Sequence, residues 1–258
     1  MLFHRVVLSA LLVGALSGLL LSAVQRWQVI PIIDAAERFE QARTPQAVEP
    51  ARGEVQAHDH GAHVHSATAW EPAEGAERIG FTVLSNVLTA AGFALIMLVA
   101  MAAALRRRDT ATQRKAAARL DWRYGLLWGL AGYAVFFVAP ALGLPPEIPG
   151  AEAAPLESRQ LWWMLTVACT AVGLTGAAFC KSPWRWTALA LLVVPYLVGA
   201  PHLGASAFAE YPPAAAAEMT ELAKRFVWAT AITNGVFWIV LGGLSGWAAQ
   251  RVVRKAVA

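Results

Sequence analysis

The sequence predicts an all-α, polytopic integral membrane protein with six transmembrane helices arranged as three hairpins. Of its 258 residues, 57% are hydrophobic and 15% are charged, against about 45–50% apolar and about 25% charged residues in soluble domains. A soluble protein of this composition would expose large apolar patches, which promote aggregation. Composition therefore excludes a soluble enzyme, a soluble nucleic-acid-binding protein and a disordered chain.

Long stretches without any Asp, Glu, Lys or Arg give the second observation. A transmembrane helix requires roughly 20 mostly apolar residues, and each of these stretches is long enough. The predicted spans are 6–25, 79–105, 124–146, 160–180, 186–209 and 226–250. No independent soluble domain is expected, so residues 1–258 form a single membrane domain.

The sorting of charges between the connecting segments gives the third observation. Alternate segments, beginning with the N-terminus, contain 13 basic and 2 acidic residues, whereas the others contain 8 and 15. Because Lys and Arg concentrate in cytoplasmic loops, both termini are predicted to be cytoplasmic. The loop 34–78 is then extracytoplasmic, and its Gly, Pro and Ala content predicts a largely flexible segment.

The first span has an alternative interpretation as a cleaved signal peptide, which would leave five spans. Arg5 forms a short basic region, and 21–23 (Leu-Ser-Ala) is an acceptable cleavage site. However, the apolar run is longer than a typical signal core, and it resumes beyond Arg26. We expect the span to be retained, and the orientation of the other five is the same in both cases.

Small residues in the spans predict close helix packing. Pairs of glycines four residues apart allow transmembrane helices to approach closely; they are Gly14 and Gly18, Gly125 and Gly129, and Gly242 and Gly246. Residues 122–143 and 184–204 also resemble each other, with Trp-Arg at the start and Ala-Pro-X-Leu-Gly at the end. This similarity indicates either an internal repeat, as in many transporters, or shared composition.

A histidine cluster in the first loop is the strongest chemical signal. Four of the six histidines fall within eight residues, together with one aspartate: His58, Asp59, His60, His63 and His65. Imidazole and carboxylate groups in this density suit divalent transition metals. The alternative is a polar loop with incidental histidines. A flexible site loses entropy on binding, so we expect modest affinity and rapid exchange, which suits capture more than permanent storage.

Uncharged polar residues are the candidates for a translocation path. The spans contain no carboxylate, so an ion would have to use amide, imidazole, sulfur or backbone groups. The candidate side chains are Gln25, Asn86, Cys169, His202 and Asn234. The alternative for the asparagines is hydrogen bonding between helices.

Other features of the spans have simpler interpretations. Pro195 and Pro201 should disrupt the fifth span and free backbone carbonyls that could act as ligands. Met97 and Met101 lie one turn apart and are expected to serve in packing. Cys169 and Cys180 are too far apart on one helix to form a disulfide. The chain has no phosphate-binding P-loop.

Several stretches together resemble the CbtA family of cobalt transporter subunits over nearly the whole chain. The most specific are 144–150 (Leu-Pro-Pro-Glu-Ile-Pro-Gly) and 159–163 (Arg-Gln-Leu-Trp-Trp). The others are the first span leading into Pro31 and Ala36-Glu37, the His-rich loop, Trp70-Glu71-Pro72, 75–78 (Gly-Ala-Glu-Arg) and 199–202 (Gly-Ala-Pro-His). One departure is that the family is usually described with five spans, whereas six are predicted here.

The resemblance implies Co²⁺ uptake across the bacterial cytoplasmic membrane, associated with cobalamin synthesis. It also implies a small single-span, histidine-bearing partner subunit of the CbtB type. Two alternatives remain: a metal-binding sensor or accessory protein that moves nothing, and a transporter of nickel or zinc. No catalytic residues and no prosthetic group are expected, because the loop offers no positioned general base.

Overall fold

The computed structural model describes residues 2–43, 72–73, 75–106, 121–180, 183–204 and 206–257, and throughout these ranges the regular structure is helical. Five helical stretches there are long and apolar enough to cross a membrane: Phe3–Gln28, Ala76–Ala104, Trp122–Gly143, Leu156–Phe179 and Pro213–Val252. These helices support the prediction of an all-α, multi-pass membrane protein.

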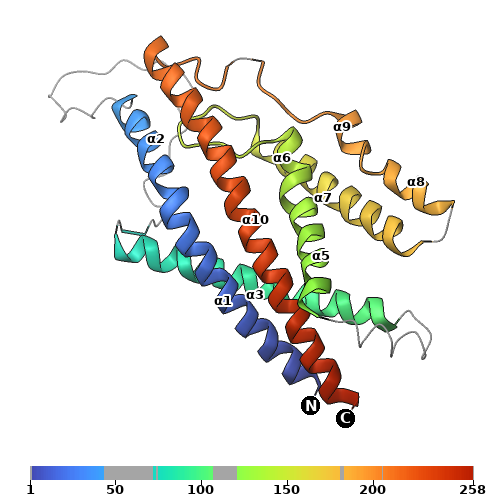
Figure 1. Ribbon diagram of the computed structural model, residues 1–258. Coiled ribbons are helices and arrows are strands. Elements are labelled where there is room, and N and C mark those ends of the chain that lie inside the picture. Colours follow the sequence, from blue (N-terminus) through green and yellow to red (C-terminus); the bar gives the residue numbers. More distant parts are fainter. Residues whose placement is uncertain are drawn as a thin grey trace, which may run out of the picture.

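The helices follow one another in a simple order, which Figure 1 traces by colour. They are α1 (Leu2–Gln28), α2 (Ile30–Arg43), α3 (Ala76–Arg106), α5 (Trp122–Tyr133), the π-helical segment η1 (Ala134–Val138), α6 (Ala139–Gly143), α7 (Leu156–Phe179), α8 (Trp184–Ala190), α9 (Val194–Val198) and α10 (Pro213–Val257). Residues 34–43, which were expected to begin the flexible loop, form the greater part of α2.

The segment 186–209, predicted as the fifth span, is not a continuous helix. Pro195 has no amide N–H to extend a helix, and α9 ends at Gly199, whose φ of +85° is incompatible with helix continuation. The apolar helical part, Trp184–Val198, would measure about 22 Å at about 1.5 Å per residue, short of a hydrocarbon core of about 30 Å. The expected six spans thus become five spans and one broken segment.

The broken segment nevertheless returns the chain to the level from which α7 started. Figure 1 shows α8 and α9 running back beside α7, after which an extended stretch leads to the start of α10. Both chain ends lie at one end of the bundle, as three successive hairpins require. Residues 122–143 and 184–204 therefore differ in structure, because only the first stretch is helical through to its Ala-Pro-X-Leu-Gly end.

Glycines set the closest helix contacts. A Cβ atom built on Gly125 or Gly129 would overlap the backbone of α10, and one built on Gly242 would overlap that of α5. On the other side of the bundle, Gly14 and Gly18 of α1 meet the backbone of α3 in the same way. The predicted role of these glycines in close packing is confirmed, and α10 becomes the central helix between α1 and α5.

Pro140 accounts for the π-helical segment in the third span. Because proline lacks an amide N–H, the helix cannot form a regular hydrogen bond to the carbonyl of Phe136. The preceding turn is wider, and the Ala139 N–H donates to the carbonyl of Ala134, five residues earlier. Within this turn, the Phe136 ring stacks on Trp238 of α10 with centroids 5.5 Å apart.

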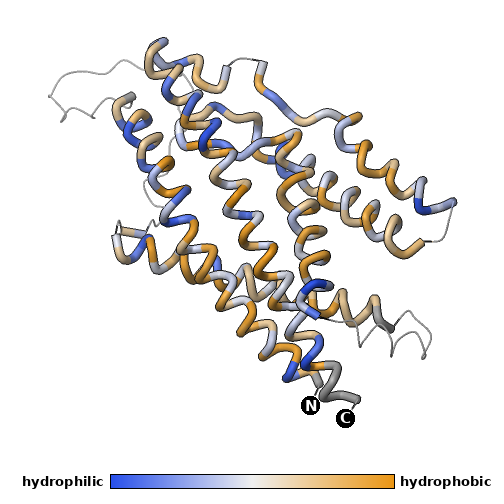
Figure 2. The backbone as a smooth tube through the Cα atoms, viewed as in Figure 1, coloured by the Kyte–Doolittle hydropathy of each residue, from blue (hydrophilic) through white to orange (hydrophobic). Residues whose placement is uncertain are grey.

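Two apolar clusters hold the bundle together. The first, between α1, α3 and α10, includes Met97, Met101 and Leu241, and both methionines are buried there as packing residues, as expected. The second joins α2 and the start of α10 to the segments 148–151 and 207–211. Figure 2 shows hydrophobic residues along the middle of the helices and hydrophilic residues gathered toward their ends, the pattern of a membrane-spanning bundle.

Candidate functional site

The predicted metal ligands His58, Asp59, His60, His63 and His65 lie outside the described residues. The segment that carries them joins the end of α2 to the start of α3. Among the residues that the structure does describe, no group of three or more His, Cys, Asp or Glu side chains could hold a metal ion.

The α2 and α3 ends that flank this loop are tied together. A guanidinium nitrogen of Arg78, at the start of α3, lies 2.7 Å from a carboxylate oxygen of Glu37 on α2. Figure 1 places α2 at the end of the bundle opposite the two chain termini. The Arg78–Glu37 ion pair thus joins the two helices that flank the histidine-containing segment in the sequence.

Two of the predicted path residues meet between α1 and α3. The Asn86 amide donates to Gln25 Oε1 over 2.6 Å and to Ser22 Oγ over 3.0 Å. Ser22 Oγ donates in turn to the Gly18 carbonyl over 2.9 Å. The close backbone approach at Gly18 brings Asn86 within reach, and the result is a partly buried cluster of amide and hydroxyl groups.

Ser22 was not among the predicted path residues. It lies three residues before Gln25, so both side chains fall on neighbouring positions of one helical face. That spacing was the signal in the sequence that could have found it.

Asn234 is placed on α10 but not in this cluster. Its amide donates to the Thr230 carbonyl of its own helix over 2.9 Å. The Thr230 hydroxyl likewise bonds carbonyls of its own helix, at Phe226 and Val227. Because the Asn234 amide bonds its own helix, it supports the expected hydrogen bond between helices less well than Asn86 does.

Cys169 and His202 are separated from the other candidates. Cys169 lies on α7, which packs against η1, α6, α8 and α9, and Figure 1 shows α5 and α6 between α7 and α1. His202 is exposed in the extended stretch after α9. Cys169 and Cys180 are both free thiols, as their spacing predicted.

A proline frees the carbonyl four residues earlier in a helix, which is that of Leu191 here, and this carbonyl accepts from the Val194 amide over 3.2 Å. The carbonyl of Pro195 itself also has partners. Trp162 Nε1 donates to it over 3.0 Å, and so does the Gly199 amide over 3.1 Å. One residue further, Tyr196 Oη donates to the Ala139 carbonyl of α6 over 2.7 Å. These bonds fasten α9 to α6 and α7 and favour a structural role for this break.

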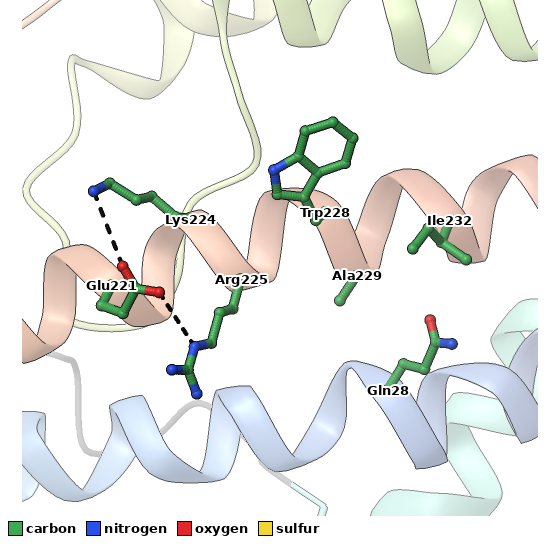
Figure 3. A pocket seen from close by; sticks show the side chains of 7 residues that line it. All are labelled: Gln28, Glu221, Lys224, Arg225, Trp228, Ala229 and Ile232. Carbon is green, nitrogen blue, oxygen red and sulfur yellow. Dashed lines mark hydrogen bonds and ion pairs between the residues drawn. The ribbon is translucent and has the colours of Figure 1, made fainter.

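A pocket of about 550 Å³ lies between the last turn of α1 and the α10 residues 221–232 (Figure 3). Its lining residues are Gln28, Glu221, Lys224, Arg225, Trp228, Ala229 and Ile232. Gln28 reaches toward Ala229 and Ile232 from the last turn of α1. Glu221 lies 3.4 Å from Arg225 and 4.0 Å from Lys224, so one carboxylate offsets part of two positive charges and the rim keeps a net positive charge.

A second cavity of about 550 Å³ is walled by the two stretches that carry the most specific resemblance. Residues 144–147 form one wall, and Arg159, Gln160 and Trp163 of α7 lie on the other. Arg159 and Glu147 form an ion pair of 2.6 Å at this site. The pair fixes the loop after α6 to the first turn of α7.

The fold defines a class: a helical, multi-pass membrane protein with a cluster of neutral polar groups between its first two spans. Comparison with protein families makes this specific. A family model described as "Probable cobalt transporter subunit (CbtA)" matches residues 3–250, and the chain belongs to this family. Searches of curated proteins and of solved structures each returned no match.

Proposed function

We propose that the protein is the membrane component of a Co²⁺ uptake system of the bacterial cytoplasmic membrane. The observation that carries the proposal is the family match over residues 3–250, whose description is a cobalt transporter subunit. In this proposal His58, His60, His63, His65 and Asp59 bind the ion outside the membrane. The helix bundle then provides its route inward, and both termini are cytoplasmic.

The Ser22–Gln25–Asn86 cluster supports a route that starts near α1. These groups lie between α1 and α3, and they offer neutral oxygen atoms near the outer end of the span. Neutral oxygens suit an ion that must be released again, because a buried carboxylate would hold a divalent cation more tightly. Among the path residues proposed from the sequence, Gln25 and Asn86 are retained, Asn234 is secondary, and Cys169 and His202 are the least supported.

The membrane potential can contribute to the driving force. An elementary charge gains about 2.3 kcal/mol per 100 mV, so a divalent cation gains about 4.6 kcal/mol when it moves to a negative interior. No ATP-binding loop is found in the sequence, and any further energy source would belong to a partner. The word "subunit" in the family description supports such a partner, and we propose a small single-span protein with its own histidines.

Uptake of radioactive cobalt into cells tests this function. Cells that express the protein with its partner should accumulate cobalt well above cells without it, and added nickel or zinc should compete only weakly. Equal accumulation would contradict the transport function, and stronger inhibition by nickel or zinc would reassign the metal.

The alternative function is a metal sensor or accessory protein that moves no ion. Purified protein in liposomes separates the two, since a transporter loads cobalt into the lumen and a sensor binds it without flux. The variant in which all four loop histidines are replaced by Ala is compared with the native protein in both the binding assay and the flux assay. It should weaken cobalt binding in either case but should affect flux only if the protein transports.

A further inference from the structure

We propose that the ion's route follows the seam between α1 and α10, entering at the pocket beside Gln28 and passing Thr233 and then Ser17. This inference rests on the proposed transport function and adds the location of the path on the α10 side of α1, next to the Gln25–Asn86 pair on its α3 side. Figure 1 shows α1 and α10 side by side along the bundle, and the two helices make one of the most extensive helix contacts in the fold.

Buried oxygen atoms without partners occur on both helices that form this seam. Gln28 Oε1, Thr233 Oγ1 and Ser17 Oγ are buried, and none has a hydrogen-bond partner within the described part of the chain. Ser17 and Thr233 expose 0% and 2% of their surface. A buried hydroxyl without a partner is unfavourable, so these positions call for water or an ion.

Other Ser and Thr hydroxyls in the bundle do have hydrogen-bond partners. In a helix, Ser and Thr commonly bond the carbonyl four residues earlier. Thr166, Thr220 and Ser22 do so, with distances of 2.7–2.9 Å. Ser17 and Thr233 have the same local option, and in the described structure neither uses it.

The three oxygens are spaced along the direction of transport. The helices run in opposite directions, and Gln28 shares the pocket with Ala229 and Ile232. Thr233 directly follows Ile232 on α10. It lies four residues beyond Ala229, which is about 6 Å along the helix axis at about 1.5 Å per residue. Ser17 lies eleven residues inward from Gln28 on α1, about 16 Å by the same rise. The column thus reaches roughly halfway through a hydrocarbon core of about 30 Å.

Helical periodicity places Gln28 and Ser17 on one face of α1, because eleven residues are close to three turns. The face between them is occupied by apolar residues, and Val13 below belongs to the same apolar cluster as Phe237 and Leu241 of α10. Phe237 and Leu241 expose only 4% and 0%. They close the seam below Thr233, in the manner of a hydrophobic constriction.

The chemistry of the seam fits a cation that keeps part of its water shell. Amide and hydroxyl oxygens accept hydrogen bonds from bound water and can replace single water ligands, but they add no charge to hold the ion. The pocket provides the wide entry, the unpaired oxygens provide successive contacts, and the constriction keeps the inner half closed in this conformation.

Cysteine accessibility tests the route independently of uptake. In full-length protein with both native cysteines replaced by Ala, Thr233→Cys and Gln28→Cys are treated with a membrane-impermeant thiol reagent from outside intact cells. Matched controls are Ile239→Cys on α10 and Leu19→Cys on α1, whose side chains face away from the protein interior and are 46% and 52% exposed. Thiols react as thiolates, which form in water and not in hydrocarbon, so we expect Thr233→Cys to react at least about tenfold faster than Ile239→Cys.

Added Co²⁺ should slow the reaction at Thr233→Cys by at least twofold, since the ion and the reagent would share the space. Ser17→Cys, beyond the constriction, should react slowly until Phe237→Ala opens it. Equal reaction at Thr233→Cys and Ile239→Cys in correctly assembled protein would overturn the route, even if cobalt uptake is intact. Fast reaction at Thr233→Cys without cobalt uptake would leave a hydrated seam but refute the transport function.

Discussion

The side-chain amide of Asn86 donates to Gln25 Oε1 over 2.6 Å and thereby joins the second membrane span to the first. Both residues are partly buried, and the same amide also bonds Ser22. In a membrane interior a polar pair of this kind contributes about 0.6–2 kcal/mol to helix association. The pair thus has a structural role whether or not an ion uses it.

Asn86→Leu should reduce both helix association and cobalt uptake. The substitution removes two hydrogen bonds and leaves Gln25 and Ser22 without their donor. We expect a loss of roughly 1 kcal/mol in stability and a rise of roughly fivefold or more in the cobalt concentration at half-maximal uptake. Thr82→Val is the control, because Thr82 is a half-buried residue of the same helix whose hydroxyl bonds the Arg78 carbonyl of that helix. An unchanged uptake curve for Asn86→Leu would remove this residue from the route.

Gly129→Val should prevent correct packing of the third span against α10. A side chain at Gly129 would overlap the backbone at Trp238, which cannot move without displacing the whole helix. Overpacking of this kind costs about 1–3 kcal/mol or more. Gly92→Val is the matched control, because a Cβ at Gly92 in α3 meets nothing within 4 Å. The measurement is the yield of monodisperse protein and its thermal midpoint, and equal values for the two variants would contradict the prediction.

Tyr196→Phe should weaken the attachment of α9 to α6 at the break in the segment 186–209. The variant removes the hydrogen bond from Tyr196 Oη to the Ala139 carbonyl, which is worth about 0.5–1.5 kcal/mol. Amide hydrogen exchange in α9 should accelerate by roughly three- to tenfold. Trp186→Phe serves as control, since Trp186 of the adjacent α8 is exposed. Equal exchange in α9 of both variants would show that the bond does not hold the break.

Cobalt capture at low concentration should weaken as the external pH falls. A metal-bound histidine must be neutral, so protons compete with the ion for the imidazole nitrogens of His58, His60, His63 and His65. Between about pH 8 and about pH 5, the cobalt concentration at half-maximal uptake should rise in the native protein. The variant with all four histidines changed to Ala should show a smaller dependence on pH. An identical dependence in the two proteins would mean that the loop histidines are not the capture site.

Much of the fold could be read from the sequence because hydropathy and charge act residue by residue. The charge-free stretches located the five long helices, and the glycine pairs marked the tight contacts of α1 and α10. The fifth predicted span failed because hydropathy records apolar composition and not helix continuity. Pro195 and Gly199 interrupt the helix inside an apolar run. The sequence predicts that Pro195 disrupts this span, but the span was still counted among the six membrane crossings.

The candidate site was only partly predictable, for a related reason. Gln25 and Asn86 stood out as amides in apolar stretches, and the structure joins them. Thr233 and Ser17 gave no such signal, because hydroxyl residues are common in membrane helices and usually bond their own backbone. Their significance comes from the lack of that bond in the described structure and from their nearly complete burial.

The sequence by itself determined that this is a multi-pass membrane protein, since the transfer of long apolar, uncharged stretches into a bilayer depends on composition alone. It also contained the histidine-rich loop and the stretches typical of the cobalt transporter subunit family. Only the tertiary structure decided that 186–209 is a broken segment fastened to α6 and α7. It alone set α1 against α10, with Gln28 beside Ala229 and Ile232 in the pocket between them, because side-chain proximity between distant segments depends on how the helices pack.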